Sequence, residues 1–237
     1  MHIKSLTVCI LTFLSSAFAN ADVILDSFEA GPLTVTADNA NGNVGVAQEN
    51  LAADDVFLGL RRTTVQGDLA SGAVQAVISD GTVTYISNAP QFNESTIFGV
   101  SFDGRLLLTY LADNRFEPFD LTTLPGETFA IDIDSVDFGG DTAVDASVSL
   151  GGGSVDFDVV ESASPYTIFV SLSDLDDAGS DLSNAINLTF DFSQIGPSTS
   201  FSIESIRVVP EPTTVVLVGF GVSLLLPRRR RLTTGCS

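Results

Sequence analysis

The sequence predicts an all-β fold, a single antiparallel β-sandwich, and three observations support this prediction. Apolar side chains alternate with polar ones at a period of two, turn signals separate the alternating runs, and no convincing amphipathic helix occurs. About a dozen short strands of this kind pack as two antiparallel sheets. The clearest runs are Val144-Ala146-Val148-Leu150, Val155-Phe157-Val159, Ile168-Val170-Leu172 and Ile186-Leu188-Phe190-Phe192, and the clearest turns are Asp80-Gly81, Asp103-Gly104, Pro125-Gly126 and Gly151-Gly152-Gly153.

The first 21 residues have the layout of a secretory signal peptide. A short basic start containing Lys4 precedes the apolar run 6–18, and small residues follow at Ala17, Ala19 and Ala21. The apolar run is too short for a stop-transfer helix. We therefore expect signal peptidase to remove residues 1–21 and the chain to be exported.

A second apolar segment lies near the other end of the chain. Residues 213–226 carry no charge, and Pro227 and the four arginines Arg228, Arg229, Arg230 and Arg231 follow them. As a helix this segment covers about 21 Å, less than the roughly 30 Å hydrocarbon core, so flanking residues must help it to span. A basic cluster marks the cytoplasmic side of a membrane segment. We expect a transmembrane helix at about 213–227, with 232–237 as a cytoplasmic tail.

The tail begins with the motif Val209, Pro210, Glu211 and Pro212. Followed by an apolar helix and an arginine cluster, this motif resembles the PEP-CTERM sorting domain of exported bacterial proteins over residues 209–231. The resemblance implies that an exosortase-type processing enzyme recognises the motif and transfers the protein to the cell surface or to an extracellular exopolysaccharide matrix. The alternative is a rigid spacer before a permanent membrane anchor.

Residues 22–208 then form one exported domain of unusual composition. Residues 22–209 contain 29 acidic and five basic side chains, all of them arginine, and no Lys, His or Cys. The composition excludes Ser-His-Asp and Cys-His nucleophiles, nitrogen- or sulfur-ligated zinc, a lysine Schiff base and disulfides. Nucleic acid is not expected as a partner, because neutralising phosphates needs a basic patch.

The closing strands narrow the expected architecture. Residues 166–175, 185–192 and 201–209 form a series similar to the end of galactose-binding-like jelly-roll modules, which implies a jelly-roll-like sandwich whose last strand returns beside the first. Ile206 and Val208 are out of phase with Phe201 and Ile203. A β-bulge near Glu204 and Ser205 would allow both pairs to be buried.

Carboxylates are the remaining candidates for site chemistry. Two clusters offer the oxygen ligands that Ca²⁺ prefers, although neither fits the EF-hand pattern. Their members are Asp132, Asp134 and Asp137 with Asp141, and Asp174, Asp176 and Asp177 with Asp181; Asp26 and Glu29 are further candidates. The alternative is that these are solvated surface charges. For Arg61 and Arg62 we expect exposed ion pairs with acids such as Asp54 and Asp55.

These observations predict a non-catalytic surface or matrix protein. The alternatives are a carbohydrate-binding module and a carboxylate-based glycan hydrolase or lyase, because a glycosidase needs only two carboxylates. Tyr85, Tyr110 and Tyr166 could stack on sugars, but burial within strands is the preferred interpretation, and the chain contains no Trp. No cofactor is expected apart from the possible Ca²⁺.

Overall fold

The computed structural model describes residues 22–38, 44–53, 55–67, 73–87, 104–112, 117–138, 144–196 and 199–210. The expected signal peptide, Asp141, Glu211, Pro212, the apolar segment 213–226 and Arg228, Arg229, Arg230 and Arg231 lie outside these ranges. Within the described ranges, no helix is long and apolar enough to cross a membrane.

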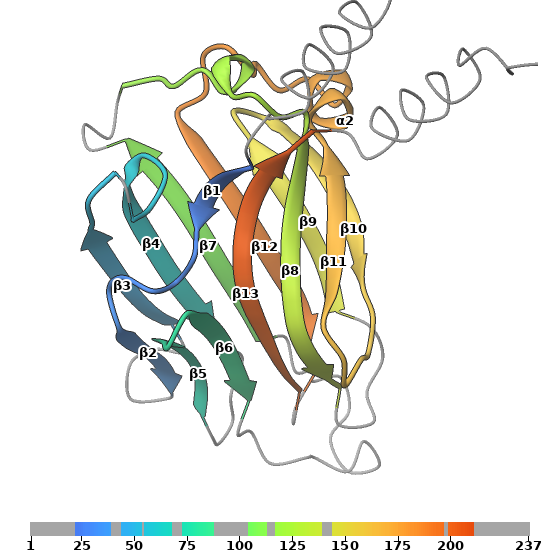
Figure 1. Ribbon diagram of the computed structural model, residues 1–237. Coiled ribbons are helices and arrows are strands. Elements are labelled where there is room, and N and C mark those ends of the chain that lie inside the picture. Colours follow the sequence, from blue (N-terminus) through green and yellow to red (C-terminus); the bar gives the residue numbers. More distant parts are fainter. Residues whose placement is uncertain are drawn as a thin grey trace, which may run out of the picture. The chain divides into compact units, whose positions relative to one another are not determined.

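The described residues form two antiparallel sheets that pack face to face, as Figure 1 shows. The sequence therefore predicted the all-β sandwich correctly. The seven-stranded sheet has the order β11-β8-β13-β6-β5-β2, with β1 also paired to β13. Its strands are β1 Val23–Asp26, β2 Leu33–Asp38, β5 Ala73–Ser79, β6 Thr82–Ser87, β8 Thr128–Asp137, β11 Tyr166–Ser171 and β13 Ser200–Val209.

The six-stranded sheet has the order β10-β9-β12-β7-β4-β3. From β6 onward the chain repeatedly crosses between the two sheets, which is the jelly-roll type of connection. The strands of this sheet are β3 Val44–Asn50, β4 Gly59–Gln66, β7 Gly104–Ala112, β9 Val144–Leu150, β10 Gly153–Val159 and β12 Asn187–Ile195.

The core lies between the sheets and is rich in aromatic side chains. Phe190 of β12 packs edge to face on Phe129 of β8 with ring centroids 5.5 Å apart, and Phe192 of β12 lies 5.2 Å from Phe201 of β13. Both contacts join one sheet to the other. Burial of such side chains drives the packing of two amphipathic sheets.

The last strand returns beside the first, as the closing series indicated. β1 pairs with β13 through Val23 opposite Val208, and Figure 1 shows the blue β1 next to the orange-red β13. The predicted bulge is confirmed, since Glu204 interrupts the register of β13 against β8 and Asp134 interrupts that of β8. As a result Phe201, Ile203, Ile206 and Val208 are all buried.

Two details of the predicted strands were wrong. Ile186 lies before β12 and is 50% exposed. The expected strand 166–175 ends at Ser171, where the short helix α2, Leu172–Asp177, begins. The Ser171 hydroxyl accepts a hydrogen bond from the Ser173 N–H, which caps the helix and stops the strand. A 3₁₀ turn, η2, spans Leu121–Thr123.

Candidate functional site

The largest fully buried side chain of the described residues is that of Arg61. In β4, Arg61, Thr63 and Val65 point inward and are buried, whereas Arg62 points outward and is exposed. Because successive side chains of a strand point to opposite faces, the two neighbouring arginines lie on opposite sides of the six-stranded sheet. The expected pairing of Arg61 with surface acids was therefore wrong.

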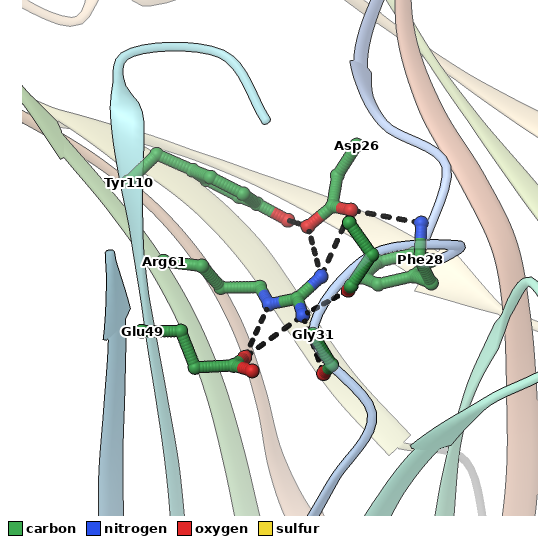
Figure 2. A network of polar contacts seen from close by, with 7 residues as sticks. Asp26, Phe28, Gly31, Glu49, Arg61 and Tyr110 are labelled. Atoms are coloured by element: carbon green, nitrogen blue, oxygen red, sulfur yellow. Dashed lines mark hydrogen bonds and ion pairs between the residues drawn. The ribbon is translucent and has the colours of Figure 1, made fainter. Parts of the chain in front are cut away.

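Arg61 lies between two carboxylates that come from different strands. Its Nη1 donates to both oxygens of Asp26 at 3.0 Å, and its Nε and Nη2 donate to Glu49 Oε2 at 3.0 and 2.8 Å. Nη2 also donates to the carbonyl oxygens of Ala30 and Gly31. Figure 2 shows the guanidinium group between the two acids. We call Asp26, Glu49, Arg61 and Tyr110 the Arg61 cluster.

Asp26 is as completely buried as Arg61 and has further donors. Its carboxylate accepts from the Phe28 N–H at 2.8 Å and from the Tyr110 hydroxyl at 3.0 Å. Burial raises the pKa of the Asp26 carboxyl group above its ordinary value, while the guanidinium of Arg61 and the hydrogen bonds oppose that rise. Burial also raises the pKa of Tyr110 well above its ordinary value, which keeps its hydroxyl protonated as a donor.

The Arg61 cluster fixes the path of the chain between β1 and β2. Two residues of this connection, Phe28 and Gly31, have positive φ angles of 56° and 69°. The Phe28 ring lies 5.6 Å from the centre of the guanidinium group. A Cβ atom at Gly31 would lie 2.3 Å from Glu49 Oε1, so only glycine lets the backbone approach the ion pair this closely.

The chemistry available to the Arg61 cluster is that of an internal ion pair. The guanidinium group of Arg61 lies between the two carboxylates. It therefore occupies the place where a metal ion would have to bind. Asp26, Arg61 and Tyr110 are each 0% exposed, so solvent and ligands do not reach them. We therefore conclude that the Arg61 cluster has a structural role in the sandwich and is not a ligand-binding site.

A second ion pair involves Asp132, one of the predicted calcium ligands. Arg207 donates to both of its oxygens at 2.9 and 3.0 Å, and Ser205 and Thr167 donate as well. Partial burial works to raise the pKa of the Asp132 carboxyl group, but the hydrogen bonds from Arg207, Ser205 and Thr167 together lower it below its ordinary value. Arg207 also pairs with Asp22.

The other predicted calcium ligands are dispersed. Asp134 lies at the bulge of β8 and Asp137 at the end of that strand, whereas Asp174, Asp176 and Asp177 lie on α2. Among the described residues, no three His, Cys, Asp or Glu side chains are grouped so as to hold a metal ion. Glu29 and Asp80 line a cleft of about 410 Å³ together with Pro32, Ser79 and Gly81.

Of the predicted sorting motif, the structure describes the first two residues. Val209 is the last residue of β13 and is 8% exposed, and Pro210 follows it directly. Two of the three tyrosines are buried strand residues, as predicted: Tyr85 and Tyr110 are each 0% exposed. Tyr166 is half-buried, and its hydroxyl donates to the Val160 carbonyl at 2.9 Å.

The outer face of the six-stranded sheet carries an extended cross-strand arrangement of polar side chains, which are exposed toward its two ends and buried at Thr189 in the middle. One cross-strand row contains only hydrogen-bonding side chains and runs through all six strands, one residue from each. In spatial order its members are Ser154 of β10, Ser149 of β9, Thr189 of β12, Thr109 of β7, Arg62 of β4 and Gln48 of β3. We call these six residues the polar row.

The polar row combines small hydroxyl groups at its centre with longer groups at one end. Thr189 donates to Thr109 through their hydroxyl groups at 3.2 Å, and Arg62 and Gln48 are exposed. Beside the row, Arg105 of β7 forms a bidentate ion pair with Asp191 of β12. No local sequence pattern reveals the row, because its members lie in six separate segments that only the strand register brings together.

Comparisons with known proteins found similarity to solved structures alone. Neither the protein-family models nor the curated proteins give a match. Among solved structures, the chain is similar to the family 11 carbohydrate-binding module of the cellulosomal cellulase Lic26A-Cel5E of Clostridium thermocellum, with 13% identity, 81% of this chain and 96% of that chain covered, and a TM-score of 0.40.

Two further solved structures are similar at lower TM-scores. One is the C-terminal family 22 carbohydrate-binding module of Clostridium thermocellum Xyn10B, with 10% identity, 81% and 97% of the two chains covered, and a TM-score of 0.31. The other is an exo-β-agarase, with 13% identity, 80% and 26% covered, and a TM-score of 0.38.

Proposed function

We propose that residues 22–209 form a non-catalytic module that binds a neutral polysaccharide on the outer face of the six-stranded sheet. The observation that supports this proposal is the polar row, which crosses every strand of that sheet. It favours the carbohydrate-binding alternative of the sequence analysis over a surface protein without a ligand.

The chemistry of the polar row suits a chain of sugars. Each sugar hydroxyl both donates and accepts hydrogen bonds, and the row offers hydroxyl groups, an amide and a guanidinium group that supply both partners. Neighbouring strands lie about 4.8 Å apart, so six strands place these groups along roughly 24 Å. A linear ligand that lies across the strands can contact several members of the row at once.

The negative charge of the domain favours neutral polysaccharides over acidic ones. The formal charge of −24 over residues 22–209 repels polyanions such as uronic acid polymers. The outward positions of the polar row include no aromatic residue, so binding depends on hydrogen bonds and not on stacking. We therefore propose a neutral glycan as the ligand.

The positions of the carboxylates support the proposal of a non-catalytic module. Asp145 and Asp158 are paired on neighbouring strands, but both are exposed on the open outer face of the sheet. Burial raises the pKa of the Asp26 carboxyl group, as a general acid requires, yet Asp26 is inaccessible inside the Arg61 cluster. A glycosidase needs two carboxyl groups that both reach the substrate, one of them with a raised pKa so that it can act as the acid; Asp26 does not reach a substrate.

Affinity electrophoresis tests the binding proposal. A fragment of residues 22–210 is run through gels that contain mixed-linked β-1,3-1,4-glucan, agarose, galactomannan or pectin. We expect retardation by at least one neutral polysaccharide and none by pectin. The variant Gln48→Ala/Arg62→Ala should lose the retardation, whereas the control Gln75→Ala, on the outer face of β5, should keep it. No retardation on any neutral polysaccharide, or equal loss in both variants, contradicts the proposal.

We also propose that this module is exported and sorted through its tail, as the motif Val209, Pro210, Glu211 and Pro212 and the arginines Arg228, Arg229, Arg230 and Arg231 suggest. Mass spectrometry of the chain from fractionated cells tests this. A mature end between Pro210 and Pro212 supports processing by an exosortase-type enzyme. A chain that keeps the arginine cluster indicates a permanent membrane anchor, and one that keeps residues 1–21 contradicts export.

A further inference from the structure

The strands at the ends of the two sheets differ in how their edges are protected. β2 and β11 end the order of the seven-stranded sheet, and β3 and β10 end that of the six-stranded sheet. An open strand edge offers unpaired N–H and C=O groups to another chain. Proteins therefore protect such edges with charges, prolines, bulges or covering segments.

Three of these four edges carry such protection. β2 and β3 contact each other, and a Cβ atom at Gly45 of β3 would lie 2.3 Å from the Thr36 carbonyl oxygen of β2. β10 presents Asp156 and Asp158, both exposed, on the outer face of its sheet. If two β10 strands paired with each other, these like charges would be brought together.

The fourth edge, that of β11, has none of these features. β11 carries no charge and no proline, and it pairs with β8 without a bulge. Among the described residues, no second strand pairs with it. Ile168, Phe169 and Val170 are residue types that favour strands, as in segments that form sheets between chains. Val170 is buried in the core, so Phe169 points to the outer face, where it is 53% exposed.

The backbone of β11 alternates between β8 and the free edge. The Leu172 N–H donates to the Glu127 carbonyl at 2.8 Å, across the pairing of β11 with β8. Because the backbone groups of successive strand residues point to opposite sides, every second residue from Leu172 back along β11 faces β8. The residues between them, Thr167, Phe169 and Ser171, therefore direct their N–H and C=O groups to the free edge.

We propose that the free edge of β11 pairs antiparallel with the same edge of a second copy of this chain, with Phe169 at the centre. A twofold axis then places Phe169 opposite its own copy and Thr167 opposite Ser171 of the partner subunit. This register uses residues 167–171 completely. It stops short of Pro165, which has no N–H, and of α2, which begins at Leu172.

The side chains of β11 match their own copies in this register. On the outer face two phenyl rings are neighbours, and a threonine hydroxyl is the neighbour of a serine hydroxyl; both kinds of cross-strand pair stabilise sheets. No charged residues are opposed. Asp132, opposite Thr167 on β8, is already paired with Arg207, and the acids of α2 begin at Asp174, beyond the paired residues.

The pairing joins the seven-stranded sheets of two copies into one continuous sheet. Its twofold axis is perpendicular to that sheet, so the six-stranded sheets of both copies lie on the same side and their polar rows face the same way. The dimer does not depend on the proposed function. Together with that function, it gives a bivalent protein that binds long glycans more tightly than one copy does.

Disulfide formation tests the register in the fragment 22–210. Residues 21–209 form a compact unit with its own core, and the fragment contains no cysteine. Thr167→Cys and Ser171→Cys are oxidised separately and as an equimolar mixture. Directly opposite residues have Cα atoms about 5.5 Å apart, which a disulfide can bridge, whereas each residue lies four positions, about 13 Å along the strand, from its own copy.

We expect the mixture to form at least five times as much disulfide-linked dimer as either variant alone. Equal amounts in all three samples, or no linked dimer in the mixture, overturn the proposed pairing.

Sedimentation equilibrium tests the contribution of Phe169. Phe169→Lys should weaken dimerisation at least tenfold, because two lysines would face each other across the axis. The control Ile186→Lys makes the same charge change at a residue that is 50% exposed and lies outside the strands, and it should leave dimerisation unchanged within twofold.

Salt gives an independent measure of the same interface. The formal charge of −24 over residues 22–209 makes two copies repel each other, so raising the NaCl concentration from about 20 to about 300 mM should strengthen dimerisation. A monomer at every protein and salt concentration overturns the proposal. So does an equal effect of the two lysine variants, or a dimer that salt dissociates. Glycan retardation of the monomeric Phe169→Lys variant checks the proposed function separately.

Discussion

Arg61 and Arg62 are neighbours in β4, yet they belong to different parts of the molecule. Arg61 is fully buried between the sheets, where each of its three nitrogen atoms donates to a carboxylate or a backbone carbonyl. Arg62 is exposed on the outer face of the six-stranded sheet, within the polar row. The two side chains have the same chemistry, and only the alternation of the strand separates them.

This difference in burial gives the two arginines different expected roles, one in stability and one in binding. The inward arginine pairs with both acids beside the β1–β2 connection, so changing it should affect stability. The outward arginine offers donors to the solvent or to a ligand, so changing it should affect binding. A shift of the β4 register by one residue would exchange the two roles.

Replacing each arginine in turn gives the largest expected contrast. Arg61→Met leaves the Asp26 carboxylate buried without its counter-charge and should lower the free energy of unfolding by about 3–5 kcal/mol. Arg62→Met should change it by less than about 0.5 kcal/mol, because the side chain is exposed. Urea denaturation of the fragment 22–210 measures both. Similar losses in the two variants would show that Arg61 is not the centre of a stabilising cluster.

A pair of glycine variants tests the packing around Arg61. Gly31→Ala and Gly151→Ala both place a side chain at a positive φ angle, 69° and 57°, but nothing lies within 4 Å of a Cβ atom at Gly151. Gly31→Ala must in addition displace Glu49, whose charged hydrogen bonds are worth about 1.5–3 kcal/mol. We expect Gly31→Ala to lower the unfolding free energy by that amount more. Equal losses in thermal unfolding would contradict the tight approach of the loop.

Tyr110→Phe removes one donor of the Arg61 cluster without removing a charge. The Asp26 carboxylate then loses its hydrogen bond from the Tyr110 hydroxyl, and we expect the free energy of unfolding to fall by about 1–2 kcal/mol. The matched control is Tyr166→Phe, whose hydroxyl bonds near the surface, and whose loss should be smaller. A larger effect at Tyr166 would place the critical hydroxyl outside the cluster.

The smallest expected effect concerns pH and the partly buried ion pair of Asp132 with Arg207. Because the pKa of this carboxyl group is lower in the folded protein than in the unfolded chain, its contribution is complete above the unfolded value of about 3.9 and is lost as the pH falls through the folded value. Asp132→Asn should therefore be less stable than the original chain at pH 7, and the difference should shrink as the pH falls below about 3.9. A stability difference that does not depend on pH, measured by urea denaturation, would contradict the ion pair.

The sequence predicted the sandwich because alternation is a local signal. The inward sets of β9 and the bulge at Glu204 could be located from runs of a few residues, since each run specifies which face is buried. The Arg61 cluster could not be predicted in this way. The one local indication of the cluster is that Arg61 shares the inward alternation of Val65. Its partner acids Asp26 and Glu49 lie 35 and 12 residues away in the sequence.

The polar row could not be predicted from local sequence either, because its members are far apart in the chain. Ser149, Thr109 and Arg62 each read as ordinary outward residues of a half-buried strand, and their alignment depends on three separate strand registers. The sorting motif is the opposite case, because its information lies in four consecutive residues. The sorting motif therefore remains a prediction from sequence, whereas the polar row is visible only in the structure.

The most direct test of the proposed binding face is an NMR titration of the fragment 22–210 with oligosaccharides of the polysaccharide that retards it. We predict that amide shifts will change at the polar row, at Gln48, Arg62, Thr109, Thr189, Ser149 and Ser154, and that the amides of Asp26, Phe28 and Arg61 will remain unchanged. Shift changes confined to the seven-stranded sheet or to the β1–β2 connection, or no changes at all, would contradict the account.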